Sequence, residues 1–157
     1  MIVFVHGVPE TASFYDALRA EIPQASEALS LPGFGCERPP GFGATKDDYV
    51  DWIATQLEAF GEPVDLVGHD WGAGFTYRLA TTRPDLLRSW AADVASIVHP
   101  DQEWHDFAQV WQTPGDGEAF IAAQLATPAE DQAPTFEEMG LTHEAALAMI
   151  GAMDETM

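Results

Sequence analysis

The residue best placed to do chemistry in this chain is an aspartate between two glycines. Gly68-His69-Asp70-Trp71-Gly72 directly follows the apolar run Val64–Val67 and precedes a helical pattern that continues to about Thr82. A Gly-x-Asp-x-Gly sequence between a strand and a helix is typical of a sharp turn that projects its central side chain, because the flanking glycines let strand and helix approach closely. The start of the helix also keeps a carboxylate ionised. We interpret Asp70 as a nucleophile, with an ordinary turn as the alternative.

The residues after the first apolar run, Ile2–Val5, supply candidate groups for the same site. His6, Gly7 and Val8 follow this run. Gly7 permits a turn in which the Val8 N–H points toward a developing negative charge, beside the N–H of Trp71. Val8 and Trp71 are therefore candidate oxyanion donors. We interpret His6 as a structural residue that bonds the loop backbone, with catalysis as the alternative. The Trp71 indole either packs in the fold or holds a leaving halide.

Apolar runs alternate with helical patterns up to about residue 94. Strands are expected at Ile2–Val5, Ala28–Leu31, Val64–Val67 and Leu86–Val94, and helices from the N-cap candidate Ser13 to Pro23, from the Thr45–Asp48 capping box to Gly61, and after the Asp70 turn. This alternation predicts an α/β fold with an open parallel sheet covered on both faces. Reactive groups gather at the carboxyl ends of the strands of such a sheet.

The pattern changes after Pro100. Helices are expected over 101–112, 116–126 and 142–153, separated by Thr113–Gly115 and Thr127–Pro134, with no further strand. The sequence therefore predicts an α/β core over residues 1–99 and a helical segment over residues 100–157. The fourth strand would be left as an uncovered parallel edge, which favours aggregation.

The chain is strongly acidic. Six Lys+Arg oppose 26 Asp+Glu for a net charge of −20, and residues 89–157 hold 13 acids and no base. Such a charge repels phosphate backbones and anionic lipids, so we expect a small-molecule partner rather than nucleic acid or membrane. No apolar run approaches the roughly 18 residues of a membrane span. The acids are scattered rather than set at ligand spacing, so we interpret them as a solvated surface, with cation binding as the alternative.

Cysteine and histidine usage limits the chemistry further. One cysteine, Cys36, excludes an internal disulfide framework and fits a reducing cytoplasm. The first residues have no basic region or cleavage site of a secretory signal. The histidines show no ligand spacing such as His-x-x-x-His. We therefore expect a cytoplasmic protein with no metal or organic cofactor, and the oligomeric state stays open.

Three motifs in order resemble those of the α/β-hydrolase superfamily. They are His-Gly-Val-Pro-Glu-Thr at 6–11, Leu-Pro-Gly-Phe-Gly at 31–35 and Gly-His-Asp-Trp-Gly-Ala at 68–73. Within the superfamily they look like the epoxide hydrolases and haloalkane dehalogenases, which use an aspartate nucleophile. The resemblance implies a nucleophile at Asp70, an oxyanion site at Val8 and Trp71, and a helical cap beginning near His99. It also implies two steps, in which Asp70 forms an alkyl ester and water activated by a histidine hydrolyses that ester.

The same resemblance implies a catalytic histidine that has no counterpart at the expected place in this sequence. In this superfamily the catalytic histidine follows the last strand, beyond the cap, whereas this chain stops at Met157 in cap-like helices, so we expect a truncated sequence. His99, His105 and His143 are interpreted as surface or cap residues. Asp93 occupies the place of the acid that orients this histidine in some dehalogenases, with a strand-end residue bonded to backbone as the alternative. A non-catalytic protein that lacks the base is the alternative function.

The substrate class is only weakly constrained by the resemblance. Epoxide hydrolases use two cap tyrosines, and no tyrosine follows residue 88 here. Dehalogenases bind halide with an asparagine or a second tryptophan, and Val8 stands where that asparagine would be. Trp104, Phe107 and Trp111 fall at helical spacing and are interpreted as packing, with a halide cage as the alternative. We expect a small apolar substrate of the epoxide or alkyl halide type.

Overall fold

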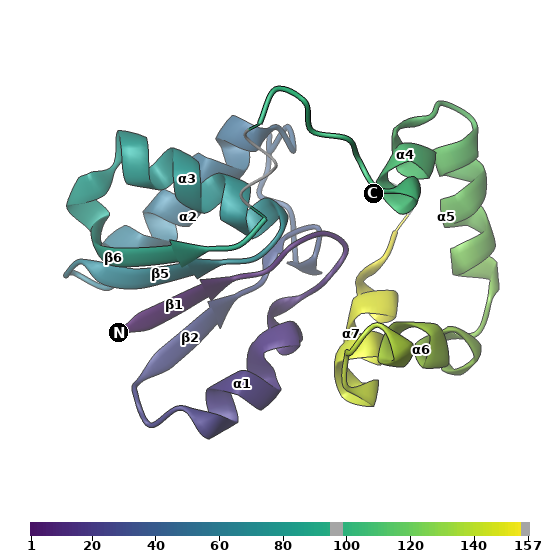
Figure 1. The fold of residues 1–157 in the computed structure, drawn as a ribbon, viewed down its shortest axis with the longest axis horizontal. Coiled ribbons are helices and arrows are strands. Elements are labelled where there is room, and N and C mark those ends of the chain that lie inside the picture. The colour runs from purple at the N-terminus through teal and green to yellow at the C-terminus, as the bar shows by residue number, and fades with distance from the viewer. Residues whose placement is uncertain (95–98, 155–157) are drawn as a thin grey trace.

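The computed structural model describes residues 1–94 and 99–154. Within them, four parallel strands form one open sheet in the order β2-β1-β5-β6 (Figure 1). The strands are β1 (Ile2–Val5), β2 (Ser26–Leu29), β5 (Val64–Gly68) and β6 (Leu87–Ala92). Val5 of β1 lies opposite both Leu29 and Gly68, so three strands end at the same level. The predicted α/β fold with a parallel sheet is confirmed.

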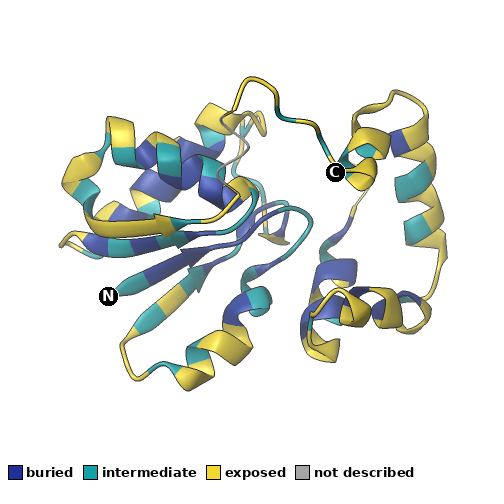
Figure 2. Cartoon of the chain, in the orientation of Figure 1, coloured by how far each residue is buried: buried dark blue, intermediate teal, exposed yellow. Residues whose placement is uncertain are grey.

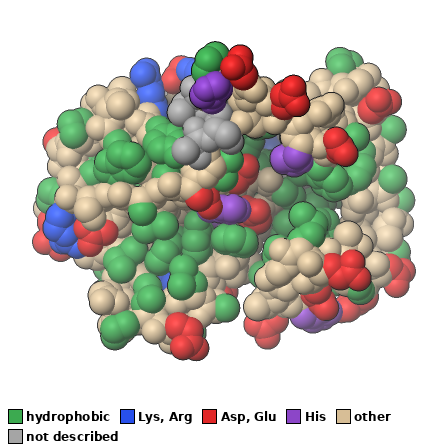
Figure 3. All heavy atoms as spheres, in the orientation of Figure 1, with side chains coloured by type: hydrophobic (Ala, Val, Ile, Leu, Met, Phe, Trp, Pro, Cys, Tyr) green, Lys and Arg blue, Asp and Glu red, His purple; other side chains and the backbone are tan. Residues whose placement is uncertain are grey.

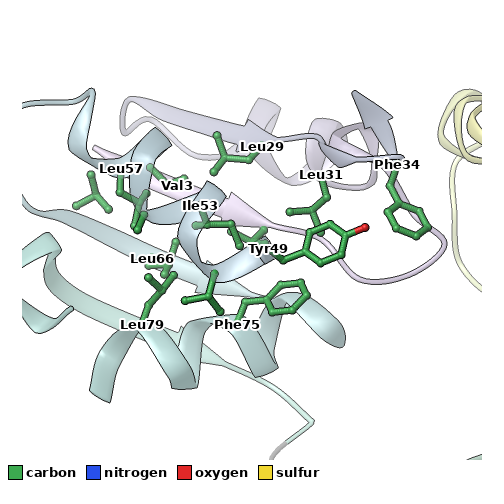
Figure 4. Close-up of a cluster of buried hydrophobic side chains, with 14 residues drawn as sticks. Val3, Leu29, Leu31, Phe34, Tyr49, Ile53, Leu57, Leu66, Phe75 and Leu79 are labelled. Atoms are coloured by element: carbon green, nitrogen blue, oxygen red, sulfur yellow. The ribbon is translucent and has the colours of Figure 1, made fainter. Parts of the chain in front are cut away.

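Helices lie on both faces of this sheet. α2 (Lys46–Glu58) and α3 (Trp71–Thr82) cover one face, and the 3-10 helix η1 (Ala12–Tyr15) with α1 (Asp16–Glu21) lies on the other (Figure 1). The main core lies between the strands and the helices α2 and α3. Buried residues occur on these strands and helices (Figure 2). Its largest fully buried members are Leu31, Ile53, Leu57, Leu66 and Leu79 (Figure 4). These contacts join segments far apart in the sequence.

Two element boundaries differ from the sequence prediction for a local reason. Ser13 does not cap a helix: it lies inside η1, and its hydroxyl pairs with that of Thr11 at 2.7 Å. The second strand ends at Leu29, because the Leu31 N–H donates to His6 Nε2 instead of continuing the sheet. Leu31–Pro32 (β3) and Gly35–Cys36 (β4) form a separate short pair.

The predicted capping box at the start of α2 is confirmed. The Asp48 N–H donates to Thr45 Oγ1 at 3.2 Å, and the Thr45 N–H donates to Asp48 Oδ2 at 3.0 Å. These two bonds satisfy backbone donors that a helix start leaves free. The start of this helix could therefore be predicted to the residue.

After the sheet, residues 99–154 form four α-helices: α4 (Asp106–Gln112), α5 (Asp116–Ala126), α6 (Ala129–Glu138) and α7 (His143–Ala152). They stand beyond the carboxyl ends of the strands (Figure 1). The prediction of a loop over Thr127–Pro134 is wrong, because α6 includes Pro134. Gln132 Nε2 donates to the carbonyls of Gln124 and Thr127, and α6 buries Ala133 and Phe136 against α7. This packing outweighs the helix-breaking tendency of proline.

β6 is the least covered strand of the sheet. A 3-10 helix, η2 (Pro84–Leu86), precedes it, and the strand runs over Leu87–Ala92 rather than from Leu86 to Val94. No residue of β6 is buried, and Trp90 is 49% exposed. The expectation of cover on both faces is therefore wrong for this strand within the described residues, whereas the expected open edge is present. No helix in the described ranges is both long and apolar enough to cross a bilayer.

Candidate active site

Asp70 occupies the tip of the turn between β5 and α3. Its backbone has φ 50° and ψ −118°, a conformation that an L-residue adopts only when its surroundings enforce it. A Cβ atom added at Gly68 would collide with the Gly72 carbonyl, and one at Gly72 would collide with the carbonyls of Val5 and His6. The close approach and the strained turn predicted from the glycine spacing are both observed.

The loop after β1 holds the carboxylate of Asp70. The Val8 N–H donates to Asp70 Oδ2 at 3.1 Å. A Cβ atom on Gly7 would lie 2.5 Å from Asp70 Cβ and 2.6 Å from Oδ2, so only glycine fits here. Within the described chain, Oδ1 of Asp70 has no hydrogen bond. One carboxylate oxygen is therefore fixed by the backbone, and the other is free.

The buried side chain of His6 holds the loop after β1 through two contacts with the backbone. The side chain is fully buried; its Nε2 accepts the Leu31 N–H at 3.0 Å, and its Nδ1 lies 2.7 Å from the Gly7 carbonyl. This pattern assigns the proton to Nδ1 of a neutral ring. Burial lowers the pKa of His6 to about 4, against a smaller opposing effect of the Gly7 bond. These contacts agree with the interpretation of His6 as a structural residue.

A second ring, that of His69, lies between two acids and directly precedes Asp70 in the chain. Its Nδ1 is 2.5 Å from Asp93 Oδ2 and its Nε2 is 3.8 Å from Glu10 Oε1. The ring also stacks on Phe14 with an interplanar angle of 8°. In the described residues, no hydrogen bond or ion pair joins a histidine ring to the Asp70 carboxylate. The carboxylates of Asp93 and Glu10 therefore hold the His69 ring in place.

Glu10 was not singled out from the sequence. Its Oε2 accepts the Gly7 N–H at 2.7 Å, which helps to fix the loop that meets Asp70. Burial raises the pKa of the Glu10 carboxyl, His69 opposes this shift, and the charges of Asp70 and Asp93 add to it. The signal for Glu10 was an acid three residues after the loop glycine, a spacing that lets the side chain reach back to the Gly7 amide.

Asp93 differs from the expectation of a buried acid that awaits a histidine from elsewhere. Its side chain is 53% exposed, because the neighbouring strand β6 is uncovered. Its Oδ1 accepts the Asp70 N–H at 3.1 Å, and its Oδ2 pairs with His69. The Tyr77 hydroxyl donates to its backbone carbonyl at 2.9 Å. Asp93 thus contacts both the backbone of Asp70 and the adjacent histidine.

The aromatic residues Trp71, Trp104, Phe107 and Trp111 divide into two groups. The Trp71 ring is 38% exposed and stacks on Trp104, with centroids 6.2 Å apart and an interplanar angle of 16°. The prediction of one helical row with Trp104, Phe107 and Trp111 is wrong, because α4 begins only at Asp106. Phe107 and Trp111 pack on Phe120 of α5 instead.

A cavity of about 630 Å³ lies between the loops of the sheet and the helices α4 and α5. Val8, whose N–H binds Asp70, forms part of its wall together with Phe34. The opposite wall is Trp111, Gln112, Pro114, Gly117, Glu118, Ile121, Ala122 and Leu125. The size and the mainly apolar wall fit a small apolar molecule. Among the described residues, no group of three or more His, Cys, Asp or Glu is arranged to hold a metal ion.

The profile of the Alpha/beta hydrolase family matches residues 2–154. A curated relative is (E)-2-((N-methylformamido)methylene)succinate hydrolase from Acinetobacter baylyi. It is 31% identical over 96 residues, which cover 57% of this chain and 35% of the relative. The chain therefore spans about a third of the length of this relative.

Solved structures share the fold over almost the whole chain. E-2-(acetamidomethylene)succinate hydrolase has a TM-score of 0.69 at 22% identity, over 97% of this chain and 56% of its own. The epoxide hydrolase VrEH1 from Vigna radiata has a TM-score of 0.68 at 20% identity, over 96% and 59%. Haloalkane dehalogenases also share this fold. The chain spans about 60% of the length of these enzymes, and at such identities the likeness shows the fold alone.

Proposed function

The chain belongs to the alpha/beta hydrolase family, and we propose that it cleaves a small apolar substrate through a covalent ester on Asp70. The observation that carries this proposal is the strained turn that presents Asp70, with one carboxylate oxygen on the Val8 N–H and the other free. A carboxylate that is already oriented loses little freedom when it attacks a bound substrate. The cavity beside Val8 would receive that substrate.

In the proposed first step, Oδ1 of Asp70 attacks an electrophilic carbon of the substrate. A carbon–oxygen bond forms as the carbon–halogen bond breaks and halide leaves, or as an epoxide carbon–oxygen bond breaks and the alkoxide takes a proton from water. In the second step, water adds to the ester carbonyl, and the alcohol leaves with Oδ1. The Val8 N–H on Oδ2 stabilises the negative charge that this addition develops, with the Trp71 N–H as the second expected donor.

The test is the mass of the intact protein after incubation with 1-bromobutane and, separately, with styrene oxide. We expect one added butyl group in place of a proton, or one added epoxide. Asp70→Asn should remove the adduct, because an amide is a poor nucleophile. Asp51→Asn, which changes an exposed aspartate on α2 in the same way, should retain it. No adduct on the unchanged protein, or an adduct that survives Asp70→Asn, would exclude Asp70 as the nucleophile.

A specific observation favours the second candidate function, a protein that forms no product. Within the described residues no histidine ring forms a hydrogen bond or ion pair with Asp70, and the adjacent His69 ring pairs with Asp93. Such a site would hydrolyse its ester slowly, because no base activates the water. An adduct that persists for hours without alcohol release would support this candidate. An adduct that disappears while alcohol accumulates would support the hydrolase.

The apolar wall of the same cavity and the net charge of the chain both indicate which class of molecule this protein would bind. A cavity with mainly apolar walls suits an uncharged small molecule, of the epoxide or alkyl halide type. The net charge of −20 opposes nucleic acid and anionic membrane surfaces. Figure 3 shows acidic side chains over both halves of the visible face, which is the surface such partners would meet. The rate of adduct formation with the two probes would separate the two substrate types.

A further inference from the structure

A second cavity, of about 340 Å³, is lined by residues of α2 and α3. Its apolar wall is Val50, Trp71 and Phe75, and Lys46 and Arg78 stand at the same cavity. It shares no lining residue with the larger cavity beside Val8. The two cavities also differ in charge, because the larger one is lined by a single charged residue, Glu118. The smaller cavity plays no part in the proposed ester chemistry.

Arg78 is unlike the other basic residues of the described chain. Each of the other five forms an ion pair: Arg19 with Asp16, Arg38 with Asp154, Lys46 with Asp47, Arg83 with Glu58 and Asp85, and Arg88 with Asp65. The guanidinium of Arg78 has no ion pair and no hydrogen bond in the described residues. Among residues 1–94 and 99–154, Arg78 is therefore the one Lys or Arg side chain without an ion pair, and it lines this cavity.

The spacing along α3 explains how this cavity is built. Trp71, Gly74 or Phe75, and Arg78 follow one another at intervals of three and four residues, so they share one side of the helix. Gly74 has no side chain, which leaves room between the indole ring and the guanidinium. Trp71 is partly exposed and lines this space, while its ring also stacks on Trp104. The cavity therefore combines a flat apolar wall with a planar cation.

The charges at the cavity limit the ligand to a single negative charge. Lys46 Nζ is 2.7 Å from Asp47 Oδ2, so these two charges largely cancel. The hydrogen bond from Lys46 lowers the pKa of Asp47, and the more distant charge of Arg78 acts in the same direction. Arg78 thus contributes the net positive charge. A dianion such as phosphate would meet Asp47 and the overall charge of −20 with only this one cation to offset them.

We propose that this cavity binds a flat apolar monocarboxylate, with the carboxylate on the Arg78 guanidinium and the ring against Trp71. The planar guanidinium matches a carboxylate with two parallel hydrogen bonds, which neither an amide nor a halide ion can reproduce. The cavity volume lies at the lower end of the range for small-molecule sites and suits a ligand with one ring. The site is independent of Asp70, although Trp71 follows Asp70 in the chain and lines this cavity.

The test is a titration of the full chain with benzoate and with its uncharged analogue benzamide, followed by calorimetry. We expect benzoate to bind about ten-fold more tightly than benzamide, the size of one charge-assisted hydrogen-bond pair. Arg78→Gln should abolish this preference. Arg19→Gln removes the same charge from α1 and should retain it. Asp70→Asn should also retain it, which separates a failure of this proposal from a failure of the proposed ester chemistry.

A second measurement uses the unchanged protein and so does not depend on the folding of a variant. The side-chain Nε–H resonance of Arg78 should shift on addition of benzoate and stay in place with benzamide. Equal binding of the two compounds would overturn the proposal, and so would a preference that survives Arg78→Gln. Shifts centred on Val8 and Trp111, with none at Arg78, would overturn it as well, because they would place benzoate in the larger cavity.

Discussion

The sheet region, residues 1–94, and the helical region, residues 99–154, are stabilised in different ways. The core of the sheet region joins β1, β2, β5, α2 and α3, which are distant in sequence. The largest buried cluster of the helical region joins only α6 and α7. All six Lys and Arg residues lie in the sheet region, whereas residues 89–157 contain 13 acids and neither Lys nor Arg. A core built from distant segments opens as a unit, whereas a two-helix cluster opens locally.

The largest effect is expected from glycine replacements in the two regions. Gly72→Val should cost about 4 kcal/mol or more of unfolding free energy, because the new side chain meets the carbonyls of Val5 and His6. Gly151→Ala in α7 meets nothing within 4 Å, so it should leave stability unchanged or raise it by about 0.5–1 kcal/mol. Urea unfolding followed by circular dichroism measures both. A fully stable Gly72→Val protein would contradict the close strand–helix approach.

Acid should weaken the sheet region through His6. Its pKa falls from 6.5 to about 4 on folding because the ring is buried. Between these two pH values, His6 is protonated in the unfolded chain and neutral in the folded chain. The stability from the neutral ring is complete above pH 6.5 and is lost as the pH falls toward 4. Between pH 7 and pH 4 the unchanged protein should lose about 3 kcal/mol more than His6→Asn, which has no such titration. Equal losses in the two proteins would show that His6 is not neutral in the fold.

The smallest effect is expected from His143 in the helical region, where stability should fall as the pH rises, the reverse of the pH dependence from His6. Glu137 hydrogen-bonds His143 at 2.6 Å and raises the pKa of that histidine, with Glu130 adding to the shift. This contribution is complete below pH 6.5 and is lost as the pH rises through the raised pKa. Amide hydrogen exchange in α6 and α7 should therefore be better protected at pH 5.5 than at pH 8, after correction for intrinsic rates. In His143→Gln this difference should disappear; if it persists, another group is responsible.

The sheet region was largely predictable because its signals are local. An apolar run followed by Gly-x-Asp-x-Gly permits few backbone paths, and the strained conformation of Asp70 follows from that spacing. The Thr45–Asp48 box fixes a helix start through two bonds within four residues. The loop of Val8 was also placed correctly against Asp70, because parallel strands end at one edge of the sheet.

The features that were missed depend on contacts between distant segments. α6 exists because Ala133 and Phe136 pack on α7, and Pro134 gives no local hint of this packing. The exposure of Asp93 reflects the uncovered strand next to it, which no spacing along the chain reveals. The link from Glu10 to His69 spans 59 positions and needs the assembled loop. The free cation of Arg78 likewise becomes visible only once the partners of every other base are known.

Because β6 is an open edge of the sheet, dissolved salt should have two opposing effects, one on the stability of the folded molecule and one on its association. The exposed strand carries Trp90, and its outer side pairs with no other strand of the described residues, so two molecules can pair edge to edge. The shared charge of −20 keeps the molecules apart at low ionic strength. Added ions shorten the range of that repulsion to about 3 Å at 1 M. The same ions also screen the repulsion between acids within each helical region. High salt should therefore stabilise the individual folded molecule and, in concentrated solution, promote association through β6.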